Sequence, residues 1–171
     1  KSNNFTRHFW DWNDMLKANE NFFYPSTPCT NLLFGLRESI RMLEEEGLDN
    51  VFNRHARFGE AARRAVRTWG LEVLCLEPLE YSPVLTAVLM PEGESADALR
   101  KVVLEKFDMS LGNGLGKVAD KVFRIGHLGD LNDLSLIGTL AGVEMGLELG
   151  GIQHTKGGVA AAMDYLSETA A

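Results

Sequence analysis

Hydrophobic residues recur at helical spacing directly after a proline-rich segment near the start of the chain. Leucine and isoleucine side chains follow one another every three or four positions from Leu32 to Leu43, which is the period of one helix face. Thr27 precedes Pro28, as an N-cap residue precedes the first residue of a helix. Gly47 stands where a C-cap glycine would stand. The pattern predicts a helix over residues 28–46.

The rest of the chain alternates between helical and strand-like patterns. A second helix is expected over residues 49–69, ended by Gly70. Runs rich in apolar and β-branched residues predict strands, and Ser95 and Asn132 are N-cap residues for two further helices. The expected strands are residues 71–76, 84–90, 109–111 and 123–128, and the later helices are 95–107, the segment after Asn132, and 158–166.

This order of elements predicts an α/β fold of two layers. A small, mainly antiparallel sheet with helices on one face is the arrangement that buries both kinds of apolar surface. Residues 1–27 are expected to form an arm in front of it, in which Trp10 and Trp12 share one face of an extended segment. The expected division is therefore an arm, 1–27, and a domain with its leading helix, 28–171.

Composition narrows the class of protein. The chain has 171 residues, of which 45% are hydrophobic, enough for one sizeable core. No apolar run is long enough to span a bilayer. The net charge of −7 argues against nucleic acid as the main partner. Arg63, Arg64 and Arg67 form a local basic cluster on the second helix, which we interpret as a solvated face.

Cysteine and histidine spacing predicts no metal site. Cys29 and Cys75 are far apart, and two unpaired cysteines are consistent with a reducing cytoplasm. The four histidines form no metal-binding pair. His127 is the exception to watch, because it follows Arg124 by three positions at the end of the same expected strand.

Arg124 is the residue with the clearest chemical indication. It lies on an apolar strand that runs into the glycines at 126 and 129. Its charge cannot be removed by deprotonation, so a partner is expected. The planar guanidinium suits a carboxylate or a phosphate. A structural ion pair is the alternative interpretation.

A second candidate site lies at the start of the first predicted helix. A helix terminus offers free backbone N–H groups and a positive dipole end to an anion. Tyr24 and Thr27 add two hydroxyls beside it. The alternative is that Thr27 is only a cap.

These segments together resemble the C-terminal part of the class V pyridoxal-phosphate (PLP)-dependent aminotransferases. The serine–glyoxylate aminotransferases are the most similar subgroup, followed by the alanine–glyoxylate aminotransferases. The resemblance extends over essentially the whole chain, and its order and spacing are more specific than any one motif. It rests on residues 9–12, 24–28, 47–52, 54–55, 82–88, 112–116 and 121–129.

The resemblance implies a role for three residues and a fold. Arg124 would bind the α-carboxylate of the amino-acid or keto-acid substrate. Tyr24 and Thr27 would reach the PLP phosphate of the neighbouring subunit across a homodimer interface. The fold would be the small domain of a fold-type-I PLP-dependent transferase. Residues 1–27 would be an arm from the end of its large cofactor-binding domain. No residue of the chain matches the family's Schiff-base lysine, which would lie upstream of Lys1.

The function implied by the resemblance is transamination. L-serine would give its amino group to glyoxylate, yielding hydroxypyruvate and glycine, with the chain inactive without its upstream part. Alanine or ureidoglycine as donor, or a class V lyase, remain alternatives within the family. A non-catalytic fragment that acts by self-association is the alternative outside it.

Overall fold

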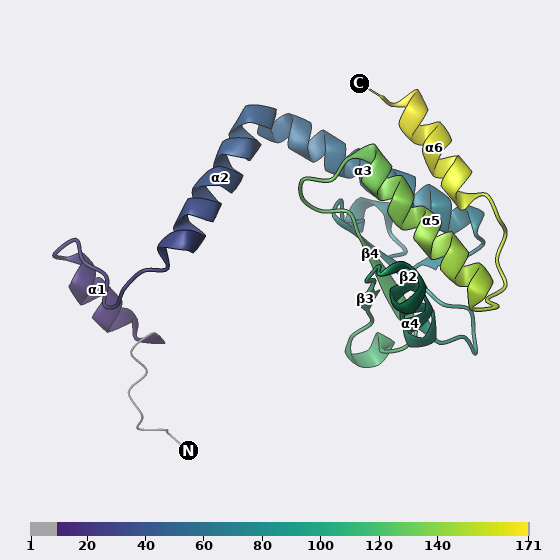
Figure 1. Ribbon diagram of the computed structural model, residues 1–171, viewed down its shortest axis with the longest axis horizontal. Coiled ribbons are helices and arrows are strands. Elements are labelled where there is room, and N and C mark those ends of the chain that lie inside the picture. Colours follow the sequence, from purple (N-terminus) through teal and green to yellow (C-terminus); the bar gives the residue numbers. More distant parts are fainter. Residues whose placement is uncertain (1–9, 171) are drawn as a thin grey trace, which may run out of the picture. The chain divides into compact units, whose positions relative to one another are not determined.

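The computed structural model describes residues 10–170, and the chain divides at Gly47 into two compact units (Figure 1). The first nine residues of the predicted arm lie outside the described part. The expected division after residue 27 concerns the domains of a longer protein and stays a prediction.

The first unit consists of two helices, α1 (Trp12–Asn19) and α2 (Thr30–Glu46). The prediction that Trp10 and Trp12 share an extended segment is wrong, because Trp12 is the first residue of α1. Asp11 caps this helix, and its side chain accepts a hydrogen bond from the backbone N–H of Asn13 at 2.9 Å. An N-cap hydrogen bond of this kind stabilises the start of a helix. The spacing of the two tryptophans does not reveal such a cap.

The predicted helix α2 is confirmed, but its start is not at Pro28. The N-cap is Cys29, whose side chain makes no capping hydrogen bond. Its carbonyl accepts the first helical bonds, from the N–H groups of Leu32 and Leu33 at 3.1 and 3.2 Å. The interpretation of Thr27 as the cap is therefore wrong. Gly47 ends the helix as expected, with a positive φ of 82°.

The second unit contains the predicted antiparallel sheet. Its strands are β1 (Glu72–Val73), β2 (Leu85–Leu89), β3 (Gly112–Asn113) and β4 (Val122–Gly126). They lie in the order β1-β2-β4-β3, and every neighbouring pair is antiparallel. The two central strands match the predicted ones, whereas β1 is shorter than expected and β3 begins after the predicted 109–111.

Four α-helices complete the described part of the second unit, as the sequence predicts. They are α3 (Leu48–Thr68), α4 (Ala96–Phe107), α5 (Asp133–Leu149) and α6 (Gly158–Glu168). The two predicted caps are confirmed, since Ser95 accepts from the N–H of Ala98 at 3.0 Å and Asn132 from that of Ser135 at 2.8 Å.

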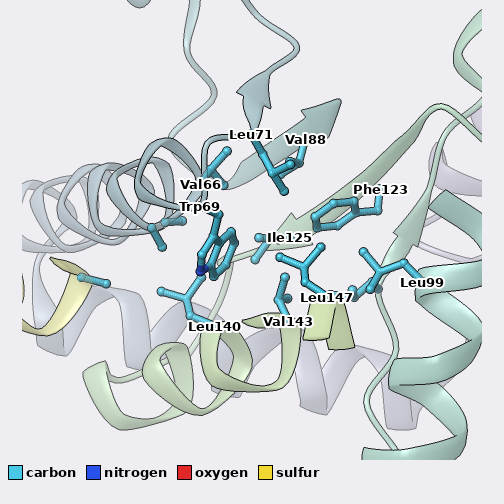
Figure 2. Close-up of a cluster of buried hydrophobic side chains, with 14 of the residues drawn as sticks. Val66, Trp69, Leu71, Val88, Leu99, Phe123, Ile125, Leu140, Val143 and Leu147 are labelled. Atoms are coloured by element: carbon cyan, nitrogen blue, oxygen red, sulfur yellow. The ribbon is translucent and has the colours of Figure 1, made fainter. Parts of the chain in front are cut away.

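The core lies between the helices and one face of the sheet. Figure 2 shows Val88, Phe123 and Ile125 of the central strands pointing towards Trp69, which directly follows α3, and Leu140 of α5. These five side chains are at most 1% exposed. Because side chains alternate along a strand, Ala87 and Arg124 lie on the opposite face. The predicted two-layer α/β fold is thus confirmed.

Candidate substrate and cofactor site

Arg124 occupies the middle of the central strand β4. It pairs with Ala87 of β2 on one side and with Gly112 of β3 on the other. Its sequence neighbours Phe123 and Ile125 are fully buried in the core, so alternation places the arginine on the face of the sheet away from the core. The apolar strand that the sequence indicates therefore serves as a rigid support for one cation.

The guanidinium of Arg124 has no anionic partner among residues 10–170. Its Nε atom is buried and makes no hydrogen bond there, and no described carboxylate forms an ion pair with it. A buried donor without an acceptor is costly, and an arginine cannot lose its charge. The described residues thus provide no ion-pair partner for Arg124, and the arginine is available for an external anion.

The turn after β4 is fixed by the first half of α3. His55 accepts a hydrogen bond at Nε2 from the N–H of Gly129, at 3.1 Å. Arg54 donates from Nη1 to the carbonyls of Gly129 at 2.8 Å and Leu131 at 3.2 Å. These bonds join residues more than seventy positions apart. They hold the chain in place directly beyond the strand that carries Arg124.

His127 anchors the same junction from the core side. It is fully buried, its backbone N–H donates to the Val84 carbonyl at 3.0 Å, and its Nε2 lies 3.0 Å from the Thr86 hydroxyl. Burial lowers the pKa of His127 to about 4, and the charge of nearby Arg63 acts in the same direction. The imidazole is therefore neutral at physiological pH. Because it faces the core and Arg124 the other side, His127 is a structural residue.

Sequence reasoning singled out His127 but gave no role to Arg54 and His55, although both belong to a matched segment. The one indication in the sequence is the glycine-rich turn after the strand, because its backbone N–H and C=O groups need hydrogen-bond partners. Which residues supply those partners depends on how α3 packs, and the sequence pattern does not contain that information.

Tyr24 and Thr27 belong to the first unit, in the segment between α1 and α2. Both are exposed. Helix α2 begins three residues after Thr27, with no acidic residue in its first turn and no side-chain cap. Two hydroxyls beside an uncapped helix start are suitable donors for a phosphate. Arg124 lies in the other unit.

The basic cluster of α3 is only partly solvated. Arg63, Arg64 and Arg67 share the carboxylate of Glu60, at 3.2–3.3 Å. The interpretation as a solvated face is wrong for Arg63, which is buried and lies over the Tyr81 ring at 4.7 Å. Packing against an aromatic ring and a paired carboxylate makes burial of this arginine possible.

Other site types find no support in the described residues. Across 10–170, no group of three potential metal ligands lies together, and both cysteines are free. The same part of the chain contains no helix with the length and apolar character needed to cross a bilayer.

Comparison with known proteins gives several relatives of high similarity, although no protein-family model matches. The serine–glyoxylate aminotransferase of Methylorubrum extorquens is 48% identical over 169 residues, which are 98% of this chain and 42% of that protein. The L-aspartate–glyoxylate aminotransferase of Paracoccus denitrificans is 42% identical over 96% of the chain and 42% of its own length. The chain thus spans about two fifths of the relatives it matches.

Solved structures agree with this result. The ureidoglycine–glyoxylate aminotransferase of Bacillus subtilis superposes with a TM-score of 0.82 at 28% identity, over 89% of this chain and 41% of that one. The homologues of this chain are therefore class V PLP-dependent aminotransferases, with serine–glyoxylate aminotransferases among them.

Proposed function

We propose that this chain is the C-terminal part of a PLP-dependent aminotransferase that transfers the amino group of L-serine to glyoxylate. The products are hydroxypyruvate and glycine. The observation that carries the proposal is the cation of Arg124, placed on the open face of the sheet with no anionic partner among residues 10–170. The identity of 48% to a serine–glyoxylate aminotransferase supports it.

Arg124 binds the carboxylate of each substrate in turn. Serine and glyoxylate differ in size and in their reacting groups, and the carboxylate is the one charged group that both share. A planar guanidinium grips it through two parallel hydrogen bonds. The rigid strand and the anchored turn behind it keep the guanidinium in one place, which orients the reacting carbon of either substrate.

Tyr24 and Thr27 hold the phosphate of PLP, in the site of the partner subunit of a homodimer. The exposed hydroxyls and the uncapped start of α2 fit a phosphate group. PLP, when bound, supplies the electron sink for the amino-group transfer. The lysine that carries it covalently belongs to the remainder of the longer protein, here called the parent protein. A cytoplasmic location stays a prediction.

The amino donor is tested by comparing L-serine, L-alanine and L-aspartate with the parent protein and glyoxylate. We expect L-serine to give the highest kcat/KM, with hydroxypyruvate and glycine formed in equal amounts. If none of the three donors yields glycine, the proposal is contradicted.

L-Aspartate is the second candidate donor. The Paracoccus denitrificans relative, at 42% identity, is named for it. Arg124 would bind the same α-carboxylate, so the site described here serves both donors. Formation of oxaloacetate faster than hydroxypyruvate would select this alternative and leave the role of Arg124 unchanged.

A further inference from the structure

We propose that Gly112 is a positioning residue for Arg124, and that the arginine grips its carboxylate end-on, through Nη1 and Nη2. The inference rests on the proposed function, since it concerns how Arg124 is held. Gly112 touches neither substrate nor cofactor in this account and acts only through the arginine.

The side chain of Arg124 lies flat across the edge strand at Gly112. The two residues are direct partners in the β3–β4 register. A Cβ atom added to Gly112 would lie 3.0 Å from the Arg124 Cβ, 3.1 Å from its Nε and 3.5 Å from its Cζ. The first two distances are tighter than most contacts that a Cβ atom makes. A side chain at 112 would therefore displace Arg124 by a few tenths of an ångström.

Contact with the edge strand has a chemical consequence for Arg124. Its Nε is sealed from solvent and makes no hydrogen bond to the described residues. A ligand oxygen cannot reach an atom that water cannot reach. The terminal nitrogens Nη1 and Nη2 are not sealed in this way, so they are the donors left for a carboxylate. The grip is thus end-on, and its direction is set by the way the side chain crosses Gly112.

The position of this glycine is otherwise unexpected. Glycine weakens a strand unless another group approaches the backbone closely. Gly126, two residues beyond Arg124 on β4, offers a matched comparison, because a Cβ there would meet nothing within 4 Å. Both glycines have ordinary negative φ values, since neither is among the positive-φ residues. The two sites therefore differ mainly in their contact with Arg124.

The test compares Gly112→Ala with Gly126→Ala in the parent protein. Single-turnover amino-group transfer is measured with L-serine and with ethanolamine, which is serine without its carboxylate. We expect Gly112→Ala to lower the rate with serine, relative to ethanolamine, by about threefold to tenfold, since a shift of about 1 Å can cost about 100-fold and the displacement here is a few tenths of that. Gly126→Ala should leave the ratio unchanged. An unchanged ratio in Gly112→Ala would overturn the proposal.

Arg124→Lys in the same assay separates this inference from the proposed function. If Arg124→Lys lowers the serine-to-ethanolamine ratio and Gly112→Ala does not, the clamp stands and the positioning role fails. If Arg124→Lys leaves the ratio unchanged, the clamp itself is wrong.

A measurement on the unaltered chain needs a variant only to assign one signal. In a ¹⁵N–¹H spectrum of arginine side chains, the Nε–H signal that disappears in Arg124→Lys belongs to Arg124. We expect it to exchange with solvent more slowly than the Nε–H of exposed Arg37. Equal exchange rates would show that Nε is open to solvent and would contradict the end-on grip.

Discussion

His127 directly follows β4, three residues after Arg124, and the two side chains have opposite surroundings. The histidine faces the core, where burial lowers its pKa to about 4, and the arginine faces away from the core without a described anionic partner. Side chains alternate between the two faces along β4 and at the residue that follows it, so Arg124 and His127 point to opposite faces. Neutral His127 stabilises the junction, and charged Arg124 is the residue that we propose binds the substrate carboxylate.

The depressed pKa of His127 predicts a pH dependence of folding. In the unfolded chain a histidine takes up its proton near pH 6.5, whereas the folded protein resists protonation until about pH 4. The unfolded state thus binds more protons between these values, and stability present above about pH 6.5 is lost as the pH falls towards 4. Urea unfolding at pH 7, 6 and 5 measures this loss.

The matched variant for this prediction is His127→Gln, which has no titrating ring. Its free energy of unfolding should be lower at pH 7 but should fall less steeply towards pH 5. Parallel curves for the two proteins would show that His127 does not cause the slope.

Tyr24 and Thr27 lead to a prediction about cofactor retention in the parent protein. Replacing Tyr24 by Phe and Thr27 by Ala should weaken PLP binding, because each hydrogen bond to a charged group is worth about 1.5–3 kcal/mol. The dissociation constant of the cofactor measures the effect, and Ser26→Ala in the same segment is the control. In mixed dimers the defect should appear in the partner subunit's site. Unchanged affinity in the double variant would remove both residues from the site.

At the scale of elements, the sequence predicts the helices and strands whose formation depends mainly on their own residues. Helices α4 and α5 carry their own apolar period and their own caps at Ser95 and Asn132, and both are found where expected. The edge strands depend on partners instead. The pairing of β1 ends soon after Val73, and β3 forms at Gly112 and Asn113, two residues of low strand propensity.

The candidate site shows the same difference between local and distant information. The sequence draws attention to Arg124 because arginine on an apolar strand is unusual, and to Tyr24 and Thr27 because they precede a periodic helix. Their roles stay predictions. The close approach of Arg124 to Gly112 and the anchoring of the turn by Arg54 and His55 join different segments of the chain. Such contacts cannot be predicted from the hydrophobic period of a segment or from the spacing of a motif.

The start of helix α6 is held by one carboxylate and by one close approach to α3. Glu144 of α5 accepts hydrogen bonds from Trp69 Nε1 at 2.8 Å and from the N–H groups of Gly157 at 2.8 Å and Val159 at 2.9 Å. Burial alone would raise the pKa of Glu144, but these hydrogen bonds hold it below the usual range. The carboxylate therefore serves as the N-terminal cap that α6 lacks in its own sequence.

The close approach predicts opposite effects for two glycine substitutions in helices. A Cβ on Gly158 of α6 would lie 2.2 Å from Trp69 Nε1 and 2.7 Å from the Ala65 carbonyl. Gly158→Ala should therefore destabilise the unit by about 1–3 kcal/mol. Gly138→Ala in α5, where a Cβ meets nothing within 4 Å, should stabilise it by about 0.5–1 kcal/mol. Urea unfolding of both variants measures the difference, and equal effects would contradict the packing described here.

At the scale of the whole molecule, burial is confined to one of the two units. Every buried apolar residue described lies at Val51 or beyond, in the unit that begins at Leu48. The first unit exposes large apolar side chains instead, for example Trp10 at 82% and Leu32 at 72%. Exposed apolar surface on this scale indicates a face that another protein surface covers.

This distribution predicts that residues 47–171 fold without the preceding segment. A chain restricted to 47–171 should unfold at nearly the same urea concentration as the full chain, because it keeps every buried apolar residue that the structure describes. It should also self-associate less, as measured by sedimentation. A clear fall in the unfolding midpoint would show that the first unit contributes to the core.

The central claim is that Arg124 binds the carboxylate of both substrates, and Arg124→Lys in the parent protein tests it most directly. An ammonium group keeps the charge but cannot form two parallel bonds, so kcat/KM should fall for L-serine and for glyoxylate alike, by about 2–5 kcal/mol in transition-state binding. The absorption spectrum of the bound cofactor should stay normal. A variant that is folded, dimeric and near wild type in kcat/KM for both substrates would contradict the account.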